Sequence, residues 1–194
     1  MKALPQMVLA ALFTGLMIGG ALITIPFPQV PLVVANAFPW LAGLILGPWW
    51  AAVSTALYLL LGAFGLPVFA KGAAGVGVLL GNTGGFLFGY LLSAIAVGLL
   101  RDPRGQSVVR NALAVLAGLI IVYLAGIPWL AFVAFHGPSG FEASHLVQAL
   151  FWATGPAAVP FLFVVGDLIK AVGVVAVAGV LVRLPGVSPL LKVK

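Results

Sequence analysis

The chain has 194 residues, of which 63% are hydrophobic and only 6% are charged. A soluble domain has about a quarter of its residues charged, so this chain cannot cover itself with a water-facing surface. It contains no cysteine, which excludes disulfides and thiolate metal sites. The net charge of +6 comes from scattered basic residues rather than from a basic stripe, so nucleic acid is not an expected partner. We expect one membrane domain over residues 1–194.

Six apolar stretches predict transmembrane helices, because a helix needs about 20 apolar residues to cross the hydrocarbon core. The second stretch contains Asn36 and Pro39, so we expect it to be kinked or partly broken. The Gly-rich stretch 68–81 is interpreted as a loop, and residues 146–153 as a short helix at the membrane surface. The sequence therefore predicts an all-α bundle of six transmembrane helices, over residues 4–25, 30–46, 49–64, 83–100, 112–135 and 160–182.

The basic residues indicate the orientation of this bundle, because short cytoplasmic loops are rich in Lys and Arg. With six spans, both termini and the loop after the fourth span share one side of the membrane. That side contains seven basic residues, whereas the opposite side contains only Lys71. A five- or seven-span arrangement would divide this set, so we predict that both termini are cytoplasmic. The seven residues are Lys2, Arg101, Arg104, Arg110, Arg183, Lys192 and Lys194.

Two ionisable residues, Asp167 and Lys170, lie inside the sixth apolar stretch. Each such group costs about 2.5–3.5 kcal/mol at membrane depth, so it is rarely present without a use. Their i, i+3 spacing places both side chains on one face of the helix. A buried ion pair that only neutralises itself is the simpler interpretation. We favour a ligand site, because Asp167 is expected about two turns below the outer surface.

The glycine-rich segment after the third stretch is the second candidate site. It runs from Gly65 through Lys71 to the sequence Gly81-Asn82-Thr83-Gly84-Gly85. Irregular backbone near membrane depth is tolerated only where it is buried in protein or lines a cavity. Asn82 or Thr83 is a suitable N-cap for the next helix, whose N-terminus would favour an anion or a carbonyl oxygen. An ordinary external loop explains the glycines equally well, so both interpretations stay open.

Small residues recur every four positions in the first and fourth stretches, which permits close helix contact in lipid. Packing inside the bundle is the commoner use of such a stripe. For the first helix, docking of a partner protein is a real alternative, because a terminal helix is often peripheral. The stripes are Ala11, Gly15 and Gly19 in the first stretch and Gly81, Gly85, Gly89 and Ser93 in the fourth.

Residues 137–140, Gly-Pro-Ser-Gly, match a motif of intramembrane serine proteases. They lie in a polar link, and neither histidine lies in a later span where it could act as the base. His136, Glu142 and His145 likewise lack the spacing of a helical metal site. An enzyme that uses Asp167 or Ser139 is therefore the weaker alternative, and no catalytic residue, metal or cofactor is predicted.

Two sequence blocks resemble the signature of the BioY family, the biotin-capturing subunits of energy-coupling-factor (ECF) transporters. Residues 59–70 read LLLGAFGLPVFA and residues 77–90 read GVLLGNTGGFLFGY. Residues 166–171, GDLIKA, resemble the last helix of that family. The resemblance implies a six-helix vitamin-binding bundle with its pocket near the outer face. The chain departs from the family at Val33, Ala35, Lys71 and Asn82, which leaves open a different small vitamin or precursor as cargo.

The resemblance implies that biotin binds in this pocket. The ureido ring of biotin has two N–H donors for Asp167 and one carbonyl acceptor for Lys170 or Asn82. Aromatic side chains would pack against the bicyclic ring, and Lys71 or backbone N–H groups of the glycine segment would meet the carboxylate. The expected ligand-binding residues are Asp167, Lys170, Asn82, Thr83, Gly84, Phe69, Lys71, Phe86, Tyr90 and Tyr58.

The resemblance also implies partners in the cell membrane. The chain lacks a phosphate-binding GxxxxGK[ST] loop, so ATP hydrolysis by that route belongs to other proteins. The expected assembly contains a transmembrane coupling subunit and two cytoplasmic ATPases, surrounded by membrane lipid. The stripe of Ala11, Gly15 and Gly19 is the expected docking face for the coupling subunit, and the chain itself is expected to be a transport subunit rather than an enzyme.

Overall fold

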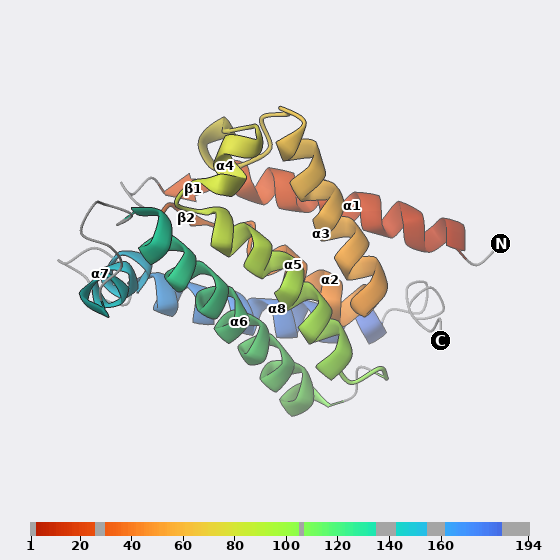
Figure 1. The fold of residues 1–194 in the computed structure, drawn as a ribbon. Coiled ribbons are helices and arrows are strands. Elements are labelled where there is room, and N and C mark those ends of the chain that lie inside the picture. Colours follow the sequence, from red (N-terminus) through yellow and green to blue (C-terminus); the bar gives the residue numbers. More distant parts are fainter. Residues whose placement is uncertain (1–2, 26–29, 105–106, 135–142, 155–161, 184–194) are drawn as a thin grey trace.

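The computed structural model describes residues 3–25, 30–104, 107–134, 143–154 and 162–183, and these form a bundle of helices (Figure 1). A two-stranded antiparallel ribbon pairs Thr24 with Val33 and Ile25 with Leu32. The elements are α1 (Ala3–Leu22), β1 (Thr24–Ile25), β2 (Leu32–Val33), α2 (Ala37–Leu46), α3 (Pro48–Ala63), the 3₁₀ turn η1 (Ala70–Gly72), α4 (Val76–Leu80), α5 (Gly84–Leu100), α6 (Val108–Ala134), α7 (Ala143–Thr154) and α8 (Leu162–Arg183).

The described helices agree in position with five of the six predicted stretches, although the first is predicted to run to residue 25, whereas α1 ends at Leu22 and Thr24–Ile25 form β1. Three of them, α1, α6 and α8, are long and apolar enough to cross a membrane, and α2, α3 and α5 are shorter apolar helices. The helix α6 begins four residues before the predicted position 112. Residue 135 and residues 160–161, at the ends of two predicted spans, lie outside the described residues. The short helix expected at residues 146–153 is confirmed as part of α7.

The second predicted span, residues 30–46, is not helical in its first part, which agrees with the expectation that it is partly broken. Residues 32–33 form β2, and the helix α2 begins only at Ala37, so it has 10 residues. Leu32 and Val33 pair with Ile25 and Thr24 of β1, which keeps this segment extended. The interpretation of residues 68–81 as a loop is also incomplete, because η1 and α4 lie within it.

The junction between α2 and α3 is held by Arg101, which follows α5. Gly47 has a φ of 83°, which favours glycine, and Pro48 is the first residue of α3, where its missing N–H costs nothing. Arg101 Nη1 donates to the carbonyls of Leu44 and Ile45 at 2.6 and 2.7 Å. Burial lowers the pKa of the Arg101 guanidinium. These hydrogen bonds satisfy carbonyls that the end of α2 leaves unpaired.

Gly85, Gly89 and Ser93 of the small-residue stripe are buried inside the bundle, as the commoner interpretation has it, whereas Gly81 lies in the turn before α5. A Cβ at Gly85 would overlap Trp129 and approach the Ala125 carbonyl oxygen at 2.6 Å. A Cβ at Gly89 would lie 3.0 Å from the Val122 Cα. Glycine therefore allows α5 and α6 to approach closely along this stripe.

The variant Gly85→Ala should be strongly destabilised, because the added methyl group meets the backbone of α6, which cannot rotate away. Overpacking of this kind typically costs about 1–3 kcal/mol. Gly173→Ala on α8 is the matched control, since an added Cβ there meets nothing within 4 Å. Thermal unfolding in detergent should show a lower midpoint for Gly85→Ala only. Equal midpoints would mean that α5 and α6 do not pack closely at this point.

The stripe of the first helix behaves differently. Ala11, Gly15 and Gly19 are all exposed, and a Cβ added at either glycine meets nothing within 4 Å. The opposite face of α1 contributes Phe13 and Met17 to the core. Within the described part of the chain, this stripe is not used for internal packing, and its use for docking stays a prediction.

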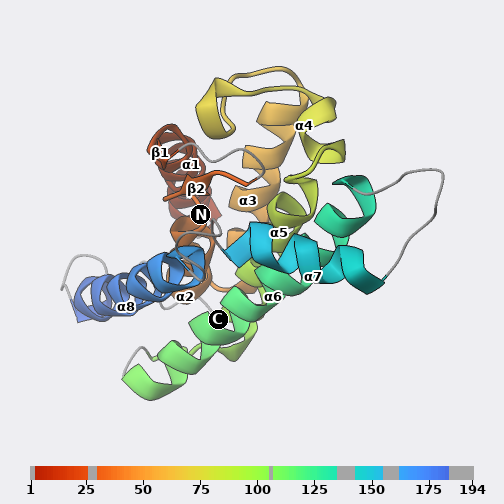
Figure 2. The same ribbon diagram turned by 90° about the vertical axis from the view of Figure 1, so that its left-hand side faces the viewer.

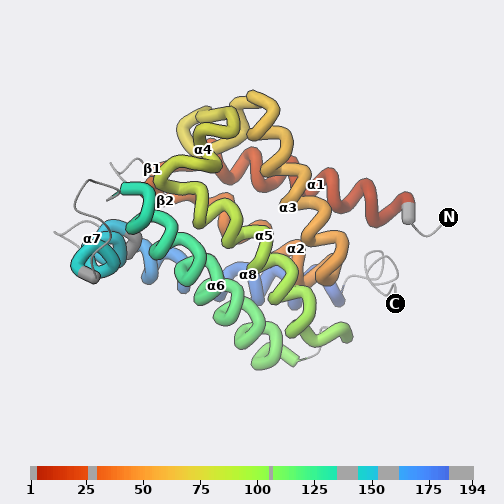
Figure 3. Tube along the Cα trace, viewed as in Figure 1, coloured from red at the N-terminus to blue at the C-terminus, as the bar shows by residue number. Residues whose placement is uncertain are grey.

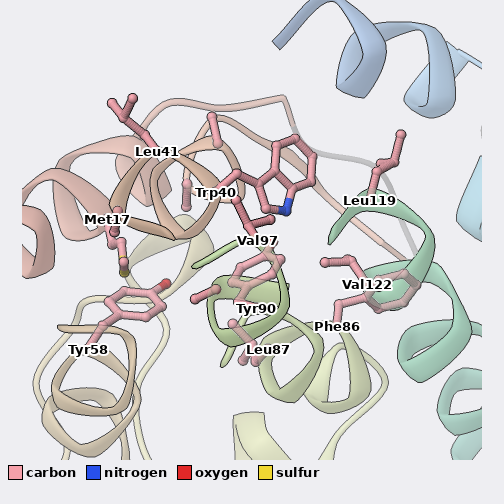
Figure 4. Close-up of a cluster of buried hydrophobic side chains, with 14 of the residues drawn as sticks. Met17, Trp40, Leu41, Tyr58, Phe86, Leu87, Tyr90, Val97, Leu119 and Val122 are labelled. Carbon is pink, nitrogen blue, oxygen red and sulfur yellow. The ribbon is translucent and has the colours of Figure 1, made fainter. Parts of the chain in front are cut away.

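One apolar core joins most of the helices (Figure 4). The helix α2 is buried along nearly its whole length, and Trp40 from this helix is fully enclosed. Figure 4 shows Trp40 in one cluster with side chains of other helices, among them Met17 of α1, Tyr58 of α3, Tyr90 of α5 and Val122 of α6. This core fixes the relative positions of α1, α3, α5 and α6 around α2.

The two ends of the bundle differ. The strands, α4 and α7 lie at one end, and they face the viewer in Figure 2. The start of α1, the turn after α5 and the end of α8 lie at the other end, as the Cα trace in Figure 3 also shows. Arg101 and Arg104 follow α5 and Arg183 ends α8, so these described basic residues gather at the second end.

Candidate ligand site

A cavity of about 230 Å³ lies between the helices. Its walls come from β2 and the residues around it, from α3, from the segment 69–73 and from α5, α6 and α8. Most of the lining side chains are aliphatic or aromatic. The polar groups come mainly from α6, α8 and the start of α2, and an apolar cavity with a few convergent polar groups is typical of a small-molecule site.

The polar groups converge on Asp167. Lys170 Nζ lies 2.5 Å from Asp167 Oδ1 and donates to Asn36 Oδ1 at 2.8 Å. Asn36 in turn donates from Nδ2 to Asp167 Oδ1 at 2.8 Å. Asp167 and Asn36 are each 5% exposed and the Lys170 side chain is 17% exposed, so the three side chains form a largely enclosed triangle on one wall of the cavity. The i, i+3 spacing places Asp167 and Lys170 on one face of α8, as expected, and they form the ion pair of the simpler interpretation. Whether this pair also binds a ligand stays a prediction.

Two further contacts complete this cluster. Tyr123 of α6 donates its hydroxyl to Asp167 Oδ2 at 3.0 Å. Lys170 Nζ also donates to the Val33 carbonyl of β2 at 2.8 Å. The extended segment that replaces the first half of the predicted second span therefore supplies a hydrogen-bond acceptor to the site, which a continuous helix would have kept within its own backbone.

The hydrogen-bonding capacity of the two charged groups is unequal. An ammonium has three donors, and Lys170 has three acceptors within reach, at Asp167, Asn36 and Val33. A carboxylate has about four acceptor positions, and the described residues fill three of those on Asp167. Asp167 can thus accept one more N–H without rearrangement, whereas Lys170 must share or exchange a partner to bind a new acceptor.

Aromatic rings form much of the remaining wall. Tyr58 and Phe69 meet edge to face with ring centroids 5.5 Å apart, and Phe86 and Tyr123 do the same at 6.3 Å. Tyr90 is 7% exposed and also lines the cavity. Such packing holds the rings in place, so a flat ligand would meet a wall of fixed shape.

The segment 69–73 covers the cavity and is anchored by Phe69. Phe69 is 1% exposed, and its ring occupies the space that a side chain at position 62 would need, so Gly62 admits it. Gly75 N donates to the Gly62 carbonyl at 2.7 Å, which closes the loop at the same point. Lys71 has a φ of 59°, is exposed and lies in the cavity lining.

The structure brings eight of the ten predicted site residues into the cavity lining. Asn82 is exposed and lies outside the lining. Gly84 is buried against the Leu79 carbonyl and Trp129, also outside the lining. Thr83 precedes α5 but makes no capping hydrogen bond with its side chain. The eight are Tyr58, Phe69, Lys71, Thr83, Phe86, Tyr90, Asp167 and Lys170.

Sequence reasoning missed Asn36 and Tyr123 as site residues. Asn36 carries a detectable signal, because it is a polar side chain inside an apolar stretch. Tyr123 carries none, since a tyrosine in a membrane helix is common and only the packing of α6 against α8 brings it to Asp167.

The residues of the weaker alternatives are placed as follows. His136, Ser139 and Glu142 lie outside the described residues, and His145 lies in α7. Among the residues that the structure describes, no group of three His, Cys, Asp or Glu side chains is placed to hold a metal.

Comparison with known proteins identifies the family. The model of the BioY family matches residues 1–185. The chain belongs to the BioY family. A probable biotin transporter BioY of Pyrococcus horikoshii is 36% identical over 179 residues, covering 92% of this chain and 96% of that protein. The biotin transporter BioY of Thermotoga maritima is 41% identical over 122 residues, covering 63% of this chain and 72% of that protein.

The fold of this BioY-family chain also resembles a solved structure. The crystal structure of the S-component for biotin from an ECF-type ABC transporter matches with a TM-score of 0.77 and 25% sequence identity. The match covers 98% of this chain and 97% of the other. Together with the apolar helices, these likenesses identify a helical multi-pass membrane protein.

Proposed function

We propose that this chain is the biotin-binding S component of an ECF-type importer in the plasma membrane. The observation that carries the proposal is the buried cluster of Asp167, Lys170 and Asn36 on the wall of an otherwise apolar cavity. The relatives named as biotin transporters and the biotin S-component with the same fold support it.

The cluster matches the polar edge of a ureido ring. Asp167 accepts a ring N–H through its remaining acceptor position, and Lys170 turns one donor from Val33 or Asn36 to the ring carbonyl. Tyr58, Phe69, Phe86 and Tyr90 pack against the bicyclic ring. Lys71, in the lining and exposed, is placed to meet the valerate carboxylate. Asn82 is the weakest of the expected ligand groups, because its side chain is exposed outside the lining.

The proposed topology has six spans with both termini in the cytoplasm. The spans are α1, the β2–α2 segment, α3, α5, α6 and α8. The start of α1, the turn after α5 and the end of α8 lie at one end of the bundle, which agrees with an even number of crossings (Figure 1). Arg101, Arg104 and Arg183 lie at that end, and the positive-inside rule makes it cytoplasmic.

The proposed assembly contains a coupling subunit and two ATPases. Transport by this chain draws energy from ATP hydrolysis in these partners, and the chain acts as the capture subunit rather than as an enzyme. The uncovered stripe of Ala11, Gly15 and Gly19 supports α1 as the docking helix for the coupling subunit.

Titration of the purified chain in detergent with biotin tests the function. The chain has five tryptophans, and their fluorescence or the heat of binding reports saturation. Biotin should bind tightly at one site per chain, and desthiobiotin, which keeps the ureido ring, should compete. Other vitamins that lack a ureido ring should not compete. If the folded chain does not bind biotin but binds another vitamin, that vitamin replaces biotin as the proposed cargo. Lys71 and Val33 are then the first lining residues to substitute.

A further inference from the structure

A second hollow, separate from the ligand cavity, lies between α6 and α8. The first turn of α6 and the last turn of α8 lie at the end of the bundle that is opposite to α7, and an open space separates the two helices there (Figure 1). A groove of about 510 Å³ runs along this opening. On α6 it begins at Val108, and on α8 it extends from Leu168 to Arg183, so it occupies the half of the bundle that is opposite to α7.

The walls of the groove are apolar and face outward. Of the twelve lining residues, Arg183 is the only charged or polar one. Several wall side chains are widely exposed, including Val108 at 56%, Val172 at 71% and Val180 at 62%. Gly179 widens the groove, because a Cβ there would meet nothing within 4 Å. A groove of this composition is complementary to hydrocarbon, such as the acyl chain of a lipid.

The positive charge of Arg183, at the mouth of the groove, indicates what kind of molecule binds there. Arg183 is exposed in the last turn of α8, and within the described residues it has no hydrogen-bond or ion-pair partner. Its guanidinium can bind a phosphate through two parallel N–H···O bonds. In the topology proposed above, this end of α8 lies at the cytoplasmic leaflet, which is rich in anionic lipid.

We propose that the groove between α6 and α8 is a binding site for one anionic phospholipid. An acyl chain lies along the apolar walls, and the headgroup phosphate pairs with Arg183. The lipid fills the space between the helices, and so supports α8, the helix that also carries Asp167 and Lys170. A transmembrane helix of a partner protein would satisfy the apolar walls but would leave the arginine at the mouth without an anion.

Native mass spectrometry of the detergent-purified, delipidated chain tests this proposal. The probes are phosphatidylglycerol and phosphatidylcholine with the same acyl chains. The wild-type chain should retain one phosphatidylglycerol in preference to phosphatidylcholine. Arg183→Gln should weaken phosphatidylglycerol binding about fivefold and leave phosphatidylcholine unchanged, as loss of one basic residue near an anionic headgroup implies. Arg104→Gln, an exposed arginine outside the groove, is the matched control and should behave as wild type.

Filling the groove provides an independent variant. Gly179→Leu should abolish retention of both lipids, whereas Gly173→Leu should not, because Gly173 is an exposed glycine of the same helix that lies outside the groove. Ala176→Leu serves the same purpose if Gly179→Leu does not fold, and biotin binding reports folding of each variant. If Arg104→Gln and Arg183→Gln weaken phosphatidylglycerol binding equally, the preference comes from general surface charge and the proposal is overturned. If Gly179→Leu retains lipid but no longer binds the coupling subunit, the groove is a protein interface and the proposal is overturned.

Discussion

The Asp167→Asn variant should lose biotin affinity about ten- to hundredfold, which corresponds to one hydrogen bond to a charged group worth about 1.5–3 kcal/mol. The carboxylate accepts from Lys170, Asn36 and Tyr123 and has one acceptor position left for the ligand. An amide offers one acceptor oxygen and places donors where the carboxylate had an acceptor. The variant therefore loses both the charge and the position that a ring N–H needs.

The same substitution leaves Lys170 without its counter-ion inside the bundle, so folding must be measured beside binding. Removing one partner of a buried ion pair costs about 3–5 kcal/mol. The double variant Asp167→Asn/Lys170→Met removes both charges, which should restore thermal stability in detergent. It should not restore biotin affinity. Recovery of affinity with stability would show that Asp167 acts only by neutralising Lys170.

Tyr123→Phe is a milder change in the same hydrogen-bonded cluster, and its biotin affinity is compared with that of Asp167→Asn. It removes only the hydroxyl that donates to Asp167 Oδ2 and keeps the ring that packs against Phe86. We expect a loss of about fivefold in affinity, because a neutral hydrogen bond that orients the carboxylate is worth about 1 kcal/mol. Calorimetric titration of both variants with biotin measures the difference. An unchanged affinity in Asp167→Asn would remove Asp167 from the ligand site.

The sequence predicts the centre of the site better than its edges. Asp167 and Lys170 are detectable because charge inside an apolar helix is costly, and their spacing along one helix determines that they meet. The bond from Asn36 to Asp167 joins residues 131 positions apart, so it depends on the packing of α2 against α8. Hydrophobic periodicity carries no information about which helices become neighbours.

Local breaks in helix geometry account for the other differences. The second predicted span is apolar except at Asn36, yet Leu32 and Val33 pair with β1 as a short ribbon. The five-residue helix α4 is too short to give a periodic pattern, and it sets the direction of the turn that exposes Asn82. Phe69, Phe86 and Tyr90 line the cavity as expected, because they belong to the two sequence blocks on either side of this turn.

Gly15→Leu should abolish biotin uptake in cells that also contain the coupling subunit and the ATPases, and should leave biotin binding by the isolated chain unchanged. Gly15 is exposed in open space, so a leucine there projects outward and does not disturb the core face of α1. Close approach of a partner helix along Ala11, Gly15 and Gly19 requires small residues at each position. A branched side chain of four carbons at the middle position separates the two helices.

The control for this variant is Gly173→Leu, the same substitution at an exposed glycine of α8 with equally open surroundings. It should retain both uptake and binding. Uptake of labelled biotin, affinity co-purification of the coupling subunit and titration of the isolated chain separate the possible causes. Loss of uptake and co-purification with intact binding places the docking surface on α1. Loss of binding as well would assign the stripe to packing, and full uptake by Gly15→Leu would move the docking surface to another helix. The stripe and Asp167 lie on different helices. We therefore expect Gly15→Leu to fail at assembly with the coupling subunit and Asp167→Asn to fail at biotin capture.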